Sequence, residues 1–135
     1  MTRENLLSTL AAAAVELGYT ASFSTDLVAS VKSGGLPLLW VEPLRVVALQ
    51  GSRDCHITYR VTAKLLIRND RMAQPTENIR TVLESDAIAL FRRVGSAAAV
   101  EAVENFVCTP CNTPLTPMAD AALKIEFDAK MFYCV

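Results

Sequence analysis

Two cysteines three positions apart, Cys108 and Cys111, form the pattern in this sequence that could most readily do chemistry. A Cys-x-x-Cys pair serves as a redox centre, as half of a zinc site or as a disulfide, and it also occurs as two ordinary buried thiols. In a redox-active pair the cysteines lie at the start of a helix, which stabilises the thiolate. Pro114 and Pro117 follow this pair and disfavour a helix there. The redox interpretation is therefore weak.

A loop is a more suitable place for a zinc site than for a redox centre. Cys55, His56 and Cys134 are the residues that could complete it. A structural zinc site usually combines two well-spaced ligand pairs, however, and this sequence has one. We therefore predict that the cysteines are small residues at a strand end and in a loop, with no metal or other cofactor bound. Cys108 and Cys111 are kept only as weak metal-ligand candidates.

Acid–base and nucleophilic catalysis have no clear residues in this chain. His56 is the single histidine, and no serine lies in a nucleophile-elbow pattern. We interpret His56 as a polar residue at the start of a strand. The sequence therefore predicts no catalytic residue and no enzymatic activity.

Composition indicates one globular domain spanning residues 1–135. The 135 residues are 52% hydrophobic and 20% charged, enough for one core and too few for two comfortable domains. The net charge is -1, and the 13 basic residues are spread along the chain, which argues against binding of nucleic acid or an anionic membrane. The apolar N-terminal stretch carries Glu4 and Glu16 in an amphipathic period, so we expect neither a signal peptide nor a membrane span.

Hydrophobic periodicity predicts two main helices. The first covers residues 3–17, where apolar residues recur at three- and four-residue steps before Gly18. The second begins at Pro75 and Thr76 and ends near Gly95. A shorter helix of at most two turns is predicted within residues 26–35. The apolar stripe of the second helix consists of Ile79, Val82, Leu83, Ala87, Leu90, Phe91 and Val94.

Strand signals occupy most of the remaining chain. Residues 56–68 alternate between apolar and polar side chains over an unusual length, and they are predicted to form a long hairpin with residues 44–50 across Gly51. Pro37 and Pro43 predict an edge strand or a bend between two strands, because proline cannot donate to a ladder. Two closing strands are predicted at 100–108 and 122–135. The expected fold is α+β, with an antiparallel sheet, a long β-hairpin and two main helices packed on one face.

This order of elements resembles the small tail-terminator and tail-completion (minor tail) proteins of long-tailed bacteriophages and their prophages. The resemblance covers most of the chain and rests on the N-terminal helix, the hairpin at 44–68, the middle helix and the closing strands. It implies a structural protein that forms a ring, usually hexameric, and binds tail-tube or head-connector proteins. It also implies a location in the virion, and in the host cytoplasm during assembly. The cysteine-containing loop departs from that family.

Charge on the hairpin suggests how copies would associate. Four basic residues are expected on its solvent face, where they would meet two acidic residues of a neighbouring subunit. One alternative is a small α+β enzyme or ligand-binding domain, with a pocket between the second helix and the sheet near His56 and the cysteines. A further alternative is a zinc-stabilised interaction module. The predicted interface residues are Arg45, Arg60, Lys64, Arg68, Glu126 and Asp128.

Overall fold

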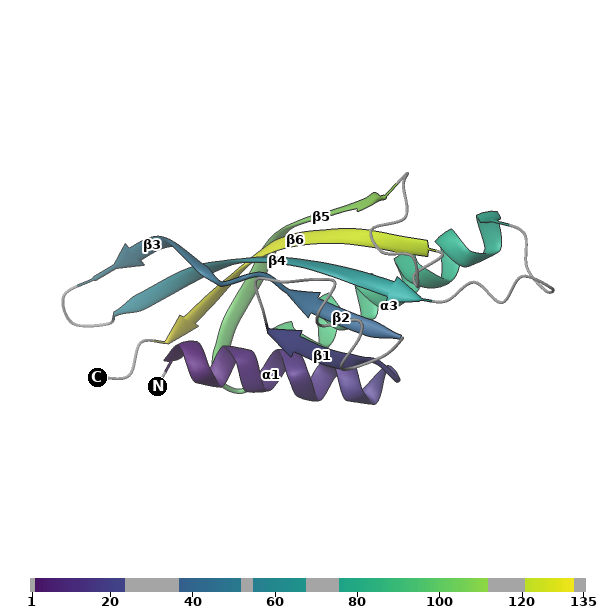
Figure 1. Ribbon diagram of the computed structural model, residues 1–135. Helices are drawn as coiled ribbons and strands as arrows, with labels where there is room; N and C mark the ends of the chain where they lie inside the picture. Colours follow the sequence, from purple (N-terminus) through teal and green to yellow (C-terminus); the bar gives the residue numbers. More distant parts are fainter. Residues whose placement is uncertain (1, 24–36, 52–54, 68–75, 112–120, 133–135) are drawn as a thin grey trace.

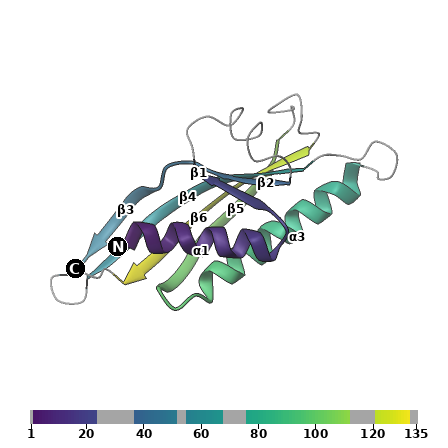
Figure 2. The same cartoon turned by 60° about the horizontal axis from the view of Figure 1, so that its bottom comes forward.

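In the part of the chain that the structure describes, one mixed β-sheet carries two helices on one of its faces (Figures 1 and 2). The structure, a computed structural model, describes residues 2–23, 37–51, 55–67, 76–111 and 121–132. The predicted α+β class, with two main helices packed on the sheet, is confirmed. The elements are α1 (Thr2–Glu16), β1 (Thr20–Phe23), β2 (Leu38–Val41), β3 (Arg45–Gln50), β4 (His56–Ile67), α3 (Thr76–Gly95), β5 (Val100–Pro110) and β6 (Ala121–Phe132).

The sheet is built around the pair β4 and β6, which are twelve residues long each. The strand order is β1-β2-β4-β6-β5, and β3 also pairs with β4. The strands pair antiparallel except for β1, which runs parallel to β2. The sheet is therefore mixed, and the prediction of a wholly antiparallel sheet was wrong at this edge. A parallel neighbour needs a connection of about a dozen residues or more, and the chain between Phe23 and Leu38 is long enough for one.

Strands β2 and β3 follow one another along the same edge of β4. Leu38–Val41 pairs with the second half of β4 and Arg45–Gln50 with the first half. The chain leaves the ladder between them at Pro43, which has no N–H to donate. Just before the break, the Glu42 amide still donates to the Thr62 carbonyl, at 2.9 Å. The predicted bend between two strands is confirmed.

Helix α1 packs one face on the sheet and stops where the sequence predicts. Leu6, Leu10 and Ala14 lie one turn apart and are buried. Gly18 has φ of 86°, a left-handed conformation that suits glycine at a helix end. The Tyr19 amide then bonds the Ala14 carbonyl, at 2.8 Å, and turns the chain into β1.

Helix α3 lies beside α1 on the same face (Figure 2). Phe91, a residue of the predicted apolar stripe, packs between the rings of Phe106 and Phe127. The centroid of its ring is 4.9 Å from that of Phe106 and 5.4 Å from that of Phe127. Val82 is exposed, so its place in the stripe was wrong. The side chain of Ile79 lies outside what the structure describes. The remaining stripe residues, Leu83, Ala87, Leu90 and Val94, are buried.

The main core lies between this helix pair and the alternating residues of β4 and β6. Val61 stands opposite Phe127 in the ladder, and both are buried. Tyr59, Val61 and Leu65 of β4 are buried in this core, under the helices. The predicted pairing of this strand with residues 44–50 is confirmed, since β4 pairs antiparallel with β3.

A polar contact joins α3 to the turn that follows α1. The Tyr19 hydroxyl donates to Asp86 Oδ2 at 2.6 Å. Burial, followed by the hydrogen bond with Asp86 and its negative charge, raises the pKa of Tyr19 well above its usual range. Tyr19 therefore stays protonated and fixes the end of α1 against α3.

Some predicted features lie outside the described residues. They are the short helix within 26–35, the hairpin tip at 52–54, Arg68 and Cys134. In the part of the chain that is described, no helix has the length and apolarity needed to cross a membrane.

Candidate functional site

The two cysteines of the Cys-x-x-Cys motif pack on opposite faces of the sheet. Cys108 lies in β5 and packs against the main core under the helices. Cys111 follows β5 and packs against a second cluster that includes Trp40. Trp40 alternates along β2 with Leu39 and Val41, which belong to the main core, so the second cluster lies on the other face. The two thiols therefore do not converge on a shared ligand.

Burial, followed by the negative charge of Glu84, raises the pKa of the Cys108 thiol. A raised pKa disfavours the thiolate, which is the form that binds metals and attacks disulfides. Within the described ranges, no three His, Cys, Asp or Glu side chains are grouped so that they could hold a metal ion.

We expect elemental analysis of protein purified without chelator to find no stoichiometric zinc. The reason is that Cys108 and Cys111 lie on opposite faces of the sheet, whereas a zinc site needs its ligands on one centre. A Cys108→Ser, Cys111→Ser double variant is the matched control and should show the same metal content as the wild type. About one zinc per chain, lost in the double variant, would contradict the prediction.

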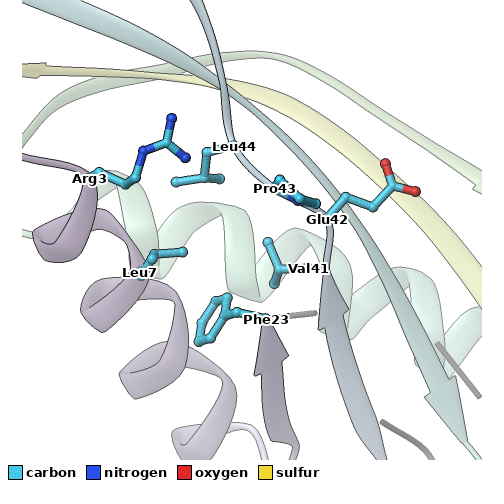
Figure 3. Close-up of a pocket in the computed structure, with 7 residues that line it drawn as sticks. All are labelled: Arg3, Leu7, Phe23, Val41, Glu42, Pro43 and Leu44. Carbon is cyan, nitrogen blue, oxygen red and sulfur yellow. The ribbon is translucent and has the colours of Figure 1, made fainter. Parts of the chain in front are cut away.

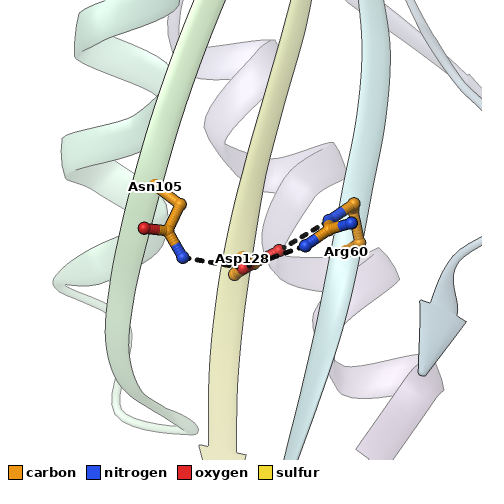
Figure 4. A network of polar contacts seen from close by, with 3 residues as sticks. All are labelled: Arg60, Asn105 and Asp128. Carbon is orange, nitrogen blue, oxygen red and sulfur yellow. Dashed lines mark hydrogen bonds and ion pairs between the residues drawn. The ribbon is translucent and has the colours of Figure 1, made fainter. Parts of the chain in front are cut away.

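The open face of the sheet carries a buried carboxylate, Asp128 of β6 (Figure 4). Arg60 Nε donates to its Oδ1 at 3.0 Å, and Asn105 Nδ2 donates to its Oδ2 at 2.9 Å. The Asp128 side chain is only 8% exposed. Asp128 is therefore not a solvated side chain, because the neighbouring strands supply its partners and cover it.

These contacts hold Asp128 in its charged form. Burial alone would raise the pKa of this carboxyl, but the hydrogen bonds from Arg60 and Asn105, with the Arg60 charge, outweigh it and hold the pKa below its ordinary value. The same hydrogen bond and the Asp128 charge raise the pKa of Arg60. The network thus joins β4, β6 and β5 by charge as well as by their backbones.

Asn105 reaches Asp128 because of a local irregularity in β5. Its φ is 60°, a left-handed conformation, and the pairing of β5 with β6 shifts register between Glu104 and Val107. Asparagine tolerates this conformation better than most residues do. The shift turns the Asn105 side chain toward β6. Sequence reasoning missed this residue, and its only signal was an asparagine inside a strand.

His56 lies near the other end of the sheet, with acidic and aromatic neighbours. Its Nε2 is 3.1 Å from Glu101 Oε2, and its ring centroid is 5.3 Å from that of Phe132. In the ladders, β6 pairs Phe132 with His56 but pairs Ile125 with Cys108. Seven residues of strand separate these positions by about 23 Å. The structure does not bring His56 and Cys108 together, so the two cannot line the same pocket.

Two of the other predicted interface charges, Lys64 and Glu126, have partners within the chain. Lys64 Nζ lies 5.0 Å from the centroid of the Trp40 ring, and Lys124 Nζ lies 3.3 Å from Glu126 Oε1. Arg45 stands opposite Arg60 in the ladder between β3 and β4. Whether these residues also contact a neighbouring subunit stays a prediction.

Strand β3 presents apolar side chains to solvent. Val46 is 50% exposed and Leu49 is 66% exposed. Both stand opposite core-facing residues of β4, Tyr59 and Ile57, so they lie on the helix side of the sheet. In Figures 1 and 2 the C-terminal end of β3 reaches past the first turn of α1. Among the described strands, β3 pairs only with β4.

A pocket of about 450 Å³ lies where β1 ends and where β2 breaks from β3 (Figure 3). Arg3 and Leu7 of α1 form one side of it. The alternative prediction placed a pocket between the second helix and the sheet, whereas this one is formed by the first helix. The remaining lining residues are Phe23, Val41, Glu42, Pro43 and Leu44.

Comparison with protein-family models gives no match, and comparison with curated proteins gives none either. Among solved structures, the chain is similar to the core region of PilO from the type IV pilus system of Pseudomonas aeruginosa. The TM-score is 0.43 at 13% sequence identity, over 83% of this chain and 95% of that one. A likeness of this degree carries no functional argument.

The predicted resemblance to phage tail-terminator proteins is contradicted by this comparison. The structural neighbour named above is a protein of the type IV pilus system and not a phage tail protein. The same comparison contradicts the predicted function as a tail ring and the predicted association with phages and prophages. The prediction failed because an order of helices and strands is shared by unrelated proteins, and no residue motif tied this chain to the phage family.

Proposed function

We propose that this chain is a structural interaction protein that associates with a second copy of itself through the free edge of β3. The single observation that carries the proposal is the pair of exposed apolar side chains, Val46 and Leu49, on that edge strand. An edge strand with unpaired backbone groups and apolar side chains is a template for pairing with another chain.

The register of β3 makes it complementary to itself. The β3 strands of two copies can run antiparallel, with Val46 of each copy opposite Leu49 of the other. Both residues of each pair then lie on the helix side of the sheet, where Tyr59 and Ile57 also lie. Four apolar side chains, two from each copy, then form one cluster that extends the two cores. Cross-strand apolar pairs of this kind are the stabilising unit of a sheet.

The same register avoids charge repulsion on the open face. Arg45 and Gln50 both lie on that face, because they pair with Arg60 and His56 of β4. In the two-fold arrangement Arg45 of one copy stands opposite Gln50 of the other. A two-fold pairing uses the same surface on both copies and closes at a dimer.

The other edges of the sheet suit pairing less well. Strand β1 has only four residues. Strand β5 has two register shifts along its length, whereas β3 has one, between Val46 and Ala48. Strand β5 also exposes Glu101 and Glu104. Bulges and charges of this kind blunt an edge.

We expect the wild-type protein to form a concentration-dependent dimer and the Leu49→Lys variant to remain monomeric. The charge would have to be buried against the second copy's Val46 in the pair. Two strands of six residues make a small interface, so analytical ultracentrifugation should extend to about 1 mM protein. Circular dichroism and thermal melting would show that the variant keeps its fold.

Val107→Lys is the matched control. Val107 is an exposed apolar residue on the opposite edge strand, β5, and its replacement should leave the dimer intact. A wild-type protein that stays monomeric throughout this range would contradict the proposal. So would a Leu49→Lys variant that dimerises as the wild type does, or a Val107→Lys variant that alone dissociates.

A further inference from the structure

We propose that the pocket beside α1 binds a small carboxylate with an apolar body. This inference concerns a different surface from the β3 edge and does not depend on self-association. The pocket volume, about 450 Å³, lies within the range of sites that bind small molecules. Three separate parts of the chain meet there: the first turns of α1, the end of β1, and the break between β2 and β3.

The walls of the pocket are mainly apolar. Leu7, Val41 and Leu44 face it from the helix and from the two sides of the break (Figure 3). Phe23 closes one end, and 42% of its surface is exposed. A ligand that covers this ring and the neighbouring aliphatic side chains removes apolar surface from water, which favours binding.

Arg3 gives the pocket one cationic group. Its guanidinium lies 5.3 Å from the centroid of the Tyr59 ring, and no ion pair joins it to a carboxylate among the described residues. A guanidinium binds a carboxylate through two parallel hydrogen bonds. Arg3 also belongs to the first turn of α1, where the helix dipole favours an anion.

Glu42 is the other charged residue of the lining. Figure 3 shows its carboxylate directed away from the Arg3 guanidinium and from the apolar walls. Glu42 therefore does not neutralise Arg3 within the pocket. A pocket with one cationic group and apolar walls favours a ligand that has one anionic end and an apolar remainder. It disfavours a cationic ligand.

Octanoate is a suitable probe, because it combines a carboxylate with a short aliphatic chain. We expect its titration, followed by ¹H–¹⁵N NMR in the millimolar range, to give saturable shifts at the amides of Leu7 and Leu44. Octanol and octylammonium, which have the same chain but no carboxylate, should bind at least tenfold more weakly, as expected for loss of a charge-assisted hydrogen bond (a factor of about ten).

Two variants test the assigned contacts. Arg3→Gln should weaken octanoate binding about tenfold, whereas Arg92→Gln, the same change at an exposed position of α3, should leave it unchanged. Leu7→Trp adds bulk to the half-buried wall and should abolish binding in a protein that still melts cooperatively. Leu49→Lys should bind octanoate as the wild type does, because Leu49 does not line the pocket.

Three results would overturn the inference. They are the absence of saturable shifts near the pocket, equal binding of octanoate and octylammonium, and equal affinity of the Arg3→Gln and Arg92→Gln variants. Because ultracentrifugation reports self-association and the titration reports the pocket, failure of one proposal is distinguishable from failure of the other.

Discussion

Val61→Asp is expected to unfold the domain. Val61 is fully buried at the centre of β4, opposite Phe127 in the ladder with β6. An aspartate there would place an unpaired charge in the main core and remove apolar contacts. The cost is expected to exceed about 4 kcal/mol, against a total stability of about 5–15 kcal/mol for a domain. Far-ultraviolet circular dichroism and thermal melting would measure it.

Thr58→Asp is the control for this substitution. Thr58 lies in the same strand but on the open face, and it stands opposite Lys130 of β6. A carboxylate in that position gains an opposite charge across the strands, so its effect is expected to stay within about 1 kcal/mol. If Val61→Asp melted like the wild type, the register of β4 would be wrong.

The second large effect is expected from Asp128→Ala. This change leaves Arg60 and Asn105 without the carboxylate to which both donate. A hydrogen bond to a charged group contributes about 1.5–3 kcal/mol, so denaturant unfolding should show a clear loss of stability. Glu126→Ala is the matched control: Glu126 lies in the same strand with an exposed partner, Lys124, and a pair of this kind contributes about 0–1 kcal/mol. Equal losses in the two variants would contradict a structural role for the network.

The pH dependence of the same network has a definite sign. The Asp128 pKa is lowered in the folded protein, so its stabilising contribution is present above the pKa of an unfolded aspartate, about 3.9. That contribution is lost as the pH falls through the folded-state pKa. We expect the difference in unfolding free energy between the wild type and Asp128→Asn to be largest near neutral pH and to shrink below about pH 4. A difference that grew on acidification would contradict this assignment.

Local patterns in the sequence were enough to predict most of the fold. The alternation in residues 56–68 predicts β4 to within a residue, because one face of that strand packs on the helices and the other does not. Gly18 marks the end of α1, and Pro43 marks the break between β2 and β3. Each of these signals depends on the residue itself or on its near neighbours.

The features that the sequence did not predict depend on distant partners. Nothing in residues 20–23 indicates that β1 runs parallel to β2. The direction of this pair depends on how Leu38–Val41, further along the chain, joins the sheet. Asp128 alternates with apolar residues as a solvated side chain would, yet Arg60 and Asn105 bury it from two other strands. The pocket likewise needs Arg3, Phe23 and Leu44 from three separate parts of the chain.

The pairing of β4 with β6 has a consequence for the order of folding. These two strands run side by side over their whole length but come from distant parts of the chain, with α3 and β5 between them. Closing so long a loop costs conformational entropy before the stabilising contacts between the two strands form. Domains rich in contacts between distant parts of the chain therefore fold slowly. The β3–β4 hairpin is local in sequence and forms on a microsecond timescale in comparable hairpins. An early species would then present Val46, Leu49 and the unpaired far edge of β4 together, which makes pairing with another nascent chain a hazard during folding.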